Sequence, residues 1–342
     1  MKARRAAVGA LAEAEQSAEQ ILAKGNAVDA VVAGVLGACA ASAGVLLGPV
    51  QILIGGAGVG IRAVDGRVRQ PGVGAPRPRG FVEGEDVPAA ATVGVPWLPA
   101  ALATALATAG TLSLSQVAGP ALDFAKKTPR HDPLSRIAAR GPRALEERPF
   151  VTELVAAAGR VADGLLTTDD LASPRPAPVA GARVGLGAGP DGVALSLGTC
   201  PWVHVVDGAP TAPAGCEVGW SRAVAAVDRN GTFAVAVFED PPEGLFIEEI
   251  GLRAPPHAAP VRRGEARIRP GDARPAACPA ALLLDPAGAV RLSVAAFGAT
   301  DAYDVLAAAL GRYVTDGLVE AHGAARFAAL SLGTSGASVL RS

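Results

Sequence analysis

The stretch that decides the fold is residues 21–30, Ile-Leu-Ala-Lys-Gly-Asn-Ala-Val-Asp-Ala. The residues before it are rich in Ala, Glu and Gln, which favour a helix, and Gly25 is the residue type expected just after a last helical turn. Asn26 suits the N-cap of a second helix over 27–43, and Asp29 places a negative charge in the first turn of that helix. We therefore expect two helices that meet at a tight glycine corner.

Residues 30–61 carry no charged side chain and exceed the roughly 20 residues needed to cross a bilayer. Pro49, Gln51 and the six glycines between residues 44 and 60 interrupt this stretch. We therefore expect a buried Ala-rich helix followed by a Gly-rich strand over 50–61, and not a membrane span. Residues 64–68, Val-Asp-Gly-Arg-Val, alternate around Asp-Gly and predict a β-hairpin turn.

The chain has 342 residues, 50% of them hydrophobic, which is ample for a core. Its 31 basic and 32 acidic residues give a net charge of −1, so we expect neither nucleic acid nor an anionic membrane as a partner. Glu13, Glu15 and Glu19 follow the basic amino terminus before any apolar segment, which predicts a cytoplasmic protein without a signal peptide. The four cysteines are scattered, so we expect no metal and no cofactor.

The pattern changes along the chain from helical to extended. Ala- and Leu-rich segments at residues 99–109 and 114–127, and an amphipathic segment at 150–162, predict helices. From residue 183 onward, short apolar runs separated by glycine turns predict strands, and residues 304–313 predict a last helix. We expect one α+β or α/β body with a helix-rich first half and a strand-rich second half.

Several segments, in a fixed order along nearly the whole chain, resemble the γ-glutamyltranspeptidase family of N-terminal-nucleophile (Ntn) hydrolases. They are the opening motif at residues 21–30, the Gly-rich strand at 54–58, Val-Gly-Val-Pro at 93–96, a helix motif at 119–125, Gly-Leu-Leu-Thr-Thr-Asp-Asp-Leu-Ala at 164–172, Val-Asp-Arg-Asn-Gly at 227–231, Arg-Pro at 274–275 and Ala-Arg-Phe at 325–327. The resemblance implies an α+β fold in the form of a four-layer αββα sandwich. It also implies that residues 1–220 correspond to the family's large chain and 221–342 to its small chain, together one αββα domain.

The resemblance places the nucleophile at Ser221, seven residues before Asp228 of the hairpin motif. In the family the chain cuts itself ahead of a Thr, which then acts as nucleophile with its freed α-amine as base. Ser221 is expected to take that part after cleavage of the Trp220–Ser221 bond. Gly298 and Ala299 stand where the family has a double glycine whose backbone N–H groups form the oxyanion hole.

Two other positions depart from the family's substrate site. The Arg that holds a substrate carboxylate in the family aligns with Gly72, and Arg69 and Arg77 are the nearby arginines that can substitute for it. The family's paired serines correspond to residues 276–277, which are both Ala, so two hydroxyl donors are missing.

Acidic and sulfur side chains supply further candidates. Glu248 and Glu249 stand where the family binds the substrate amine, although an exposed edge strand or turn is the preferred explanation for them. Cys200 and Cys216 flank Ser221 in sequence and are alternative nucleophiles. His257 is isolated in the sequence and is interpreted as a surface or strand residue.

The sequence therefore predicts a divergent γ-glutamyltranspeptidase-like amide hydrolase or acyltransferase. Its expected substrate is a small amide or amino-acid-like molecule of biosynthetic origin, not glutathione, because the carboxylate clamp and the serine pair are lost. The alternative is an unprocessed, inactive homologue that serves as a binding or scaffold protein. Either is compatible with a homo-oligomer.

Overall fold

The computed structural model describes residues 5–56, 58–76, 78, 80–172, 176–333 and 336–341, and it contains two six-stranded antiparallel sheets. Sheet I has the order β1 (Ala6–Gly9), β9 (Ser221–Val227), β10 (Phe233–Glu239), β2 (Val50–Gly56), β3 (Gly60–Gly66) and β4 (Pro178–Ala180). Sheet II has the order β16 (Gly336–Arg341), β15 (Arg326–Gly333), β14 (Val290–Phe297), β13 (Ala280–Leu284), β6 (Ala194–Thr199) and β5 (Ala182–Ala188). Two small hairpins join β7 (His204–Val206) to β8 (Ala209–Thr211) and β11 (Leu245–Ile247) to β12 (Leu252–Ala254).

Most helices come from the first half of the chain, as expected. They are α1 (Ala12–Leu22), α2 (Ala27–Ala41), α3 (Leu98–Ala109), α4 (Leu114–Val117), α5 (Gly119–Ala125), α6 (His131–Arg140), α7 (Phe150–Ala158) and α8 (Thr168–Leu171), with α9 (Ala302–Asp316) near the end. Short 3-10 turns are η1 (Ala89–Thr92), η2 (Gly141–Glu146), η3 (Arg160–Ala162), η4 (Val218–Trp220) and η5 (Glu248–Ile250). The mixture of helix and sheet confirms the α+β class.

The predicted glycine corner between α1 and α2 is present. The side chain of Asn26 accepts hydrogen bonds from the backbone N–H groups of Val28 and Asp29, and the Asp29 carboxylate accepts one from the Asn26 N–H. This reciprocal capping box fixes the start of α2. Because α2 is buried along almost its whole length, its Ala- and Val-rich composition reflects packing between layers and not contact with lipid.

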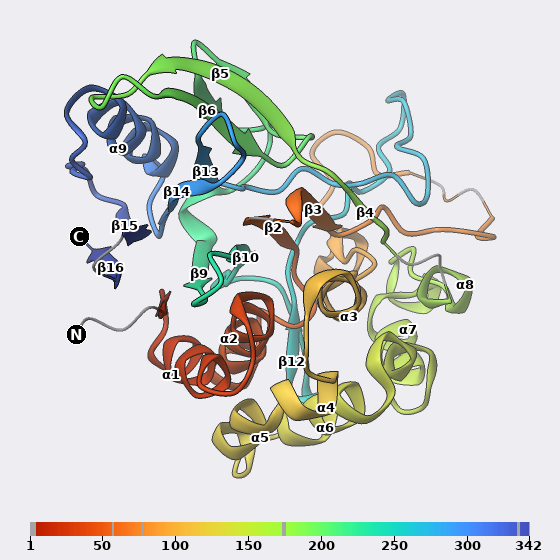
Figure 1. Ribbon diagram of the computed structural model, residues 1–342. Helices are drawn as coiled ribbons and strands as arrows, with labels where there is room; N and C mark the ends of the chain where they lie inside the picture. Colours follow the sequence, from red (N-terminus) through yellow and green to blue (C-terminus); the bar gives the residue numbers. More distant parts are fainter. Residues whose placement is uncertain are drawn as a thin grey trace.

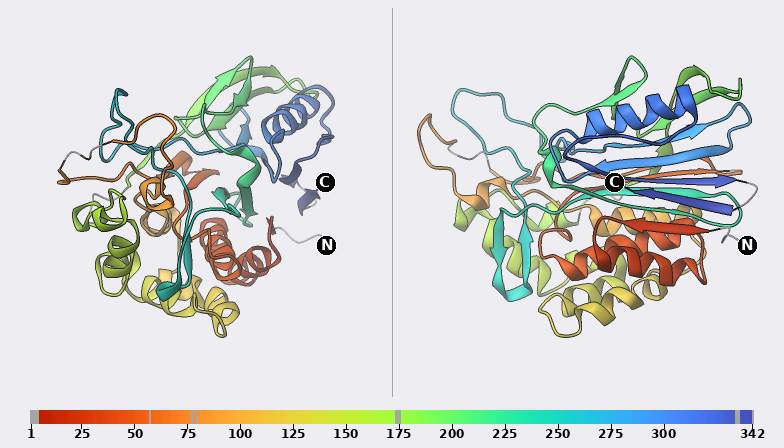
Figure 2. Two further views of the ribbon diagram at one scale, coloured as in Figure 1. Left: turned by 180° about the vertical axis from the view of Figure 1, so that it is seen from behind. Right: turned by 90° about the vertical axis from the view of Figure 1, so that its left-hand side faces the viewer.

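Three apolar cores lie between the layers (Figures 1 and 2). Alternation along β2 sends Ile52 and Ile54 towards the helices and Leu53 towards sheet II. The third core lies between the outer face of sheet II and α9, which includes the buried Leu306. The right-hand view of Figure 2 shows α9 on one side of the stacked sheets and the α1–α8 group on the other.

One sequence prediction is corrected here, and the expectation that residues 30–61 do not form a membrane-spanning helix agrees with the structure. The chain reverses between Gly56 and Gly60, both of which have positive φ angles that suit glycine. Asp65 lies within β3 and pairs with Gln51 of β2, so the prediction of a hairpin turn at 64–68 was wrong. Among the described residues, no helix is long and apolar enough to cross a membrane.

Candidate active site

Polar side chains gather on the inner face of sheet I, at the end where β9 begins. Alternation along β9 places Ser221 on the same face as Ala223 and Ala225, which pack between the two sheets. Glu239 lies directly opposite Ser221 in the β9–β10 register, and Gln51 lies on the next strand, β2. Ser221 is 0% exposed and Glu239 and Gln51 are 1% exposed, so this is a buried polar cluster at the rim of an apolar core.

Ser221 and the bond before it are held by backbone hydrogen bonds. The Ser221 Oγ donates to the carbonyl of Val218, at 2.7 Å, within the one-turn helix η4. The carbonyl of Trp220, which belongs to the Trp220–Ser221 bond, accepts from the N–H of Asp240 at 3.0 Å. The Ser221 hydroxyl thus follows directly on a carbonyl group, that of Trp220, whose oxygen already accepts a backbone hydrogen bond.

Glu239 connects the Ser221 strand to a histidine. Its Oε1 accepts from the N–H of Ala277 at 3.3 Å. Its Oε2 lies 3.1 Å from Nε2 of His257, although the two atoms are not aligned as a hydrogen bond. His257 is 9% exposed, and its carbonyl accepts from Nε of Arg274 at 2.9 Å. His257 is thus not an isolated surface residue, and the sequence analysis missed both members of this pair.

The strand order of sheet II brings residues 276–278 to the same place. The amide Nε2 of Gln51 donates to the carbonyl of Ala277 at 2.8 Å, and Nε1 of Trp202 donates to the Gln51 side chain. The N–H of Cys278 donates to the Tyr303 hydroxyl at 2.8 Å. The segment that carries two alanines in place of the family's serines therefore lies against Glu239 and Gln51.

Gly298 and Ala299 also lie at this end. A methyl group added to Gly298, whose φ is +88°, would lie 3.8 Å from Nη1 of Arg222, which itself donates to the carbonyl of Ser221 at 2.8 Å. A methyl group on Gly219 would lie 3.9 Å from the carbonyl carbon of Ala299. The structure thus places residues 298–299 beside the turn that precedes Ser221.

The cysteines are poor nucleophiles in this setting. Burial, followed by the negative charge of Glu239, raises the pKa of Cys216 to about 11. The hydrogen bond with Cys278, 4.0 Å between the sulfur atoms, and burial raise the pKa of Cys200 well above its usual value. Both therefore remain thiols at neutral pH, and only a thiolate is strongly nucleophilic.

The expected substrate-binding residues are only partly brought together. Nη2 of Arg69 pairs with Asp65 at 2.9 Å, and its guanidinium stacks 3.9 Å above the Trp97 ring, so both interactions hold it at the sheet edge. Arg77 lies outside the described residues. Glu248 and Glu249 are exposed in η5, which connects β11 to β12, and this hairpin extends along the helices away from β9 (Figure 1).

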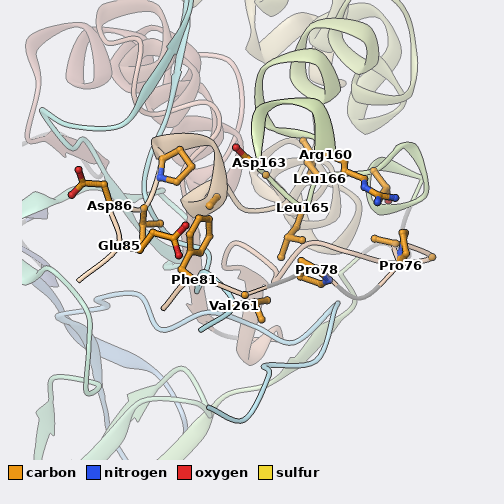
Figure 3. Close-up of a pocket in the computed structure, with 18 residues that line it drawn as sticks. Pro76, Pro78, Phe81, Glu85, Asp86, Arg160, Asp163, Leu165, Leu166 and Val261 are labelled. Atoms are coloured by element: carbon orange, nitrogen blue, oxygen red, sulfur yellow. The ribbon is translucent and has the colours of Figure 1, made fainter. Parts of the chain in front are cut away.

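A separate cavity of about 810 Å³ lies beside the loop that precedes η1 (Figure 3). Leu165, Leu166, Phe81 and Val261 give it an apolar lining, and Glu85 is among its acidic residues. Ser221, Glu239 and His257 do not line it. This cavity is therefore distinct from the polar cluster around Ser221. Within the described part of the chain, no group of three or more His, Cys, Asp or Glu residues could hold a metal ion.

Comparison with solved structures defines the fold. A cephalosporin acylase from Bacillus halodurans matches 99% of this chain and 94% of its own chain, with a TM-score of 0.67 and 14% identity. The protein LmbA2991T421A matches 99% of this chain and 96% of its own, with a TM-score of 0.62 and 14% identity.

The chain has the fold of the cephalosporin acylase. The resemblance seen in the sequence is confirmed at the level of the fold. A γ-glutamyltranspeptidase from Pseudomonas nitroreducens also matches, at 23% identity and a TM-score of 0.47 over 58% of this chain and 71% of its own. No protein-family model and no curated protein matches the chain.

Proposed function

We propose that this chain is a γ-glutamyltranspeptidase-like amide hydrolase or acyltransferase whose nucleophile, Ser221, becomes amino-terminal when the Trp220–Ser221 bond is cut. One observation carries the proposal. Ser221 is the first residue of β9 and lies fully buried at the rim between the two sheets, opposite a carboxylate. If Ser221 only began a strand, a buried glutamate on the same face of the sheet would not be needed beside it.

The proposed self-cleavage is an attack of the Ser221 Oγ on the carbonyl carbon of Trp220. The N–H of Asp240 already points at that carbonyl oxygen, so it is in place to stabilise the negative charge that develops there. Gly298 and Ala299 lie beside the same turn, and we assign their backbone N–H groups to the oxyanion of the later substrate reaction. The product is a chain of residues 1–220 and a chain of residues 221–342 within one four-layer αββα domain.

The proposed substrate is a small amide other than glutathione, with no cofactor. Residues 276–277, where the family has paired serines, are both Ala and offer no hydroxyl to a glutamyl group. Glu248 and Glu249 are exposed in the turn η5 of the β11–β12 hairpin. A biosynthetic amide that is recognised mainly by shape and backbone contacts fits this site better.

The test is the state of the purified chain. Denaturing electrophoresis and intact mass should show two fragments that meet between Trp220 and Ser221 in place of the 34.0 kDa chain. Ser221→Ala should remain a single chain, because the nucleophile is gone, and Ser221→Thr should still cleave, because the hydroxyl is kept. A wild-type chain that stays whole and takes up no acyl-directed probe favours the alternative, an inactive binding or scaffold homologue. That alternative is supported by the engagement of the Ser221 hydroxyl with Val218.

A further inference from the structure

Self-cleavage needs a proton acceptor that exists before the chain is cut. The freed α-amine of Ser221 can serve as base in later turnovers, but it is part of a peptide bond during the first step. Some other group must then take the hydroxyl proton. Resting on the function proposed above, we propose that Glu239 accepts the Ser221 hydroxyl proton during self-cleavage, and that His257, whose Nε2 lies 3.1 Å from Oε2, positions this carboxylate.

The position of Glu239 follows from the strand register. It is the partner of Ser221 in the last pair of the β9–β10 ladder. Directly opposed residues of antiparallel strands have their Cα atoms about 4.5–5.5 Å apart and their side chains on one face. The carboxylate therefore projects beside the serine side chain, in a place that is 1% exposed. In the intact chain the Ser221 hydroxyl donates to the Val218 carbonyl, so the proposed step requires the hydroxyl to leave this acceptor.

The contacts of Glu239 suit a charged, accepting carboxylate. The Ala277 N–H donates to Oε1, and His257 lies against Oε2. The hydrogen bond from Ala277 engages Oε1, whereas Oε2 has no hydrogen-bond partner among the described residues and is the oxygen that can accept a proton.

The proposed step balances as follows. The Ser221 Oγ gives its proton to Glu239 and bonds to the carbonyl carbon of Trp220, while the Asp240 N–H holds the oxyanion. The C–N bond then breaks, and Glu239 returns the proton to the departing Ser221 nitrogen, which leaves an ester between Trp220 and the Ser221 Oγ. Water hydrolyses the ester with Glu239 again as acceptor, giving a carboxylate on Trp220 and a free Ser221.

Other ionisable groups lie near Glu239 and Ser221. They are Cys216, Tyr303, Cys278 and the guanidinium groups of Arg222 and Arg274. Burial raises the pKa of Cys216 and of Tyr303, so both stay protonated near neutrality and neither competes with Glu239 for the Ser221 proton.

The experiment measures two rates on the full chain made by cell-free synthesis. The first is conversion of the intact chain into its two fragments after a pulse of labelled amino acid, from about pH 5 to about pH 9. The second is labelling of Ser221 by a fluorophosphonate probe, located by peptide mass mapping. The variants are Glu239→Gln, Glu239→Asp, His257→Gln and Ser221→Ala, with Glu19→Gln, an exposed residue of α1, as the matched control.

Glu239→Gln should slow cleavage by at least about 100-fold, the usual contribution of a positioned base, while Glu19→Gln leaves cleavage unchanged. Labelling of Ser221 should fall together with cleavage, because the uncut chain has no free α-amine to serve as base. Glu239→Asp should restore part of the rate, since a carboxylate remains. His257→Gln, which removes the imidazole beside Oε2 and keeps Glu239, should slow cleavage less than Glu239→Gln does.

Two further results are decisive in the other direction. If the wild type cleaves or is labelled and folded Glu239→Gln does so at the same rate, Glu239 is not the acceptor, and the proposed function stands without it. If the wild type neither cleaves nor is labelled, Ser221 is not a nucleophile, and the proposed function and this inference both fail.

Discussion

Gly72 shows at the scale of one residue why a carboxylate clamp cannot be rebuilt at its family position. Its φ is +111°, which an L side chain rarely adopts, and a Cβ there would lie only 2.7 Å from Nη2 of Arg267. The guanidinium that lies near position 72 therefore belongs to Arg267, in a different segment of the chain. Nε and Nη2 of Arg267 are buried and have no hydrogen-bond partner among the described residues.

The loss of this clamp predicts that γ-glutamyl-p-nitroanilide and glutathione are not turned over at a useful rate. Several charge-assisted hydrogen bonds, each worth about 1.5–3 kcal/mol, are absent without an Arg at position 72 and the serine pair. Release of p-nitroaniline is the measurement. Steady release of p-nitroaniline by the wild type, abolished in Ser221→Ala, would contradict the prediction. If that release were also lost in Arg267→Ala, the carboxylate clamp would be assigned to Arg267.

At the scale of elements, Asp29 joins the start of α2 to the segment that follows α3. Its carboxylate is 0% exposed and accepts from the N–H groups of Asn26, Thr111 and Leu112, and from the Thr111 hydroxyl. The two oxygens of the Asp29 carboxylate therefore connect the start of α2 to the segment that follows α3. The capping box is therefore part of the tertiary structure as well as of α2.

Asp29→Asn should lower the free energy of unfolding by about 3 kcal/mol, since hydrogen bonds to a charged group are replaced and an amide donor faces other donors. Urea denaturation in a Ser221→Ala background, where the chain stays whole, is the measurement. Asp304→Asn, at an exposed first-turn position of α9, is the control and should change stability by less than about 0.5 kcal/mol. Equal stability of the two variants would show that the Asp29 contacts contribute little.

At the scale of the whole molecule, the proposed cut falls inside the structure and not between separable parts. β9 and β10 follow the cut, yet they lie between β1 and β2 of the preceding segment and pair with both. In sheet II, β13 likewise pairs with β6 across the two segments. The two fragments would share both sheets and all the hydrogen bonds between these strands.

The fragments should therefore stay together after cleavage. Native size exclusion should give one species that contains both fragments, at the elution volume of the uncut Ser221→Ala chain. Separation should require denaturant, because the contact between them is the interior of two sheets and not a surface interface. Fragments that separate in native buffer would place the cut elsewhere in the chain.

The sequence by itself determined the features that depend on near neighbours. Asn26, Asp29 and Gly25 define the α1–α2 corner because capping involves residues within four positions of one another. The alternation of residues 233–239 even contained a signal that was missed, since it puts Glu239 in phase with the inward-facing Val235 and Val237. The five-residue loop from Asp228 to Thr232 then sets its register against Ser221.

The tertiary structure decided the contacts between distant residues. His257 reaches Glu239, Gln51 binds the carbonyl of a residue 226 positions away, and residues 298–299 lie beside the turn before Ser221. The same packing carries Glu248 away from the nucleophile. No local periodicity encodes such contacts, because they arise only when two sheets stack and their strand ends meet at one edge.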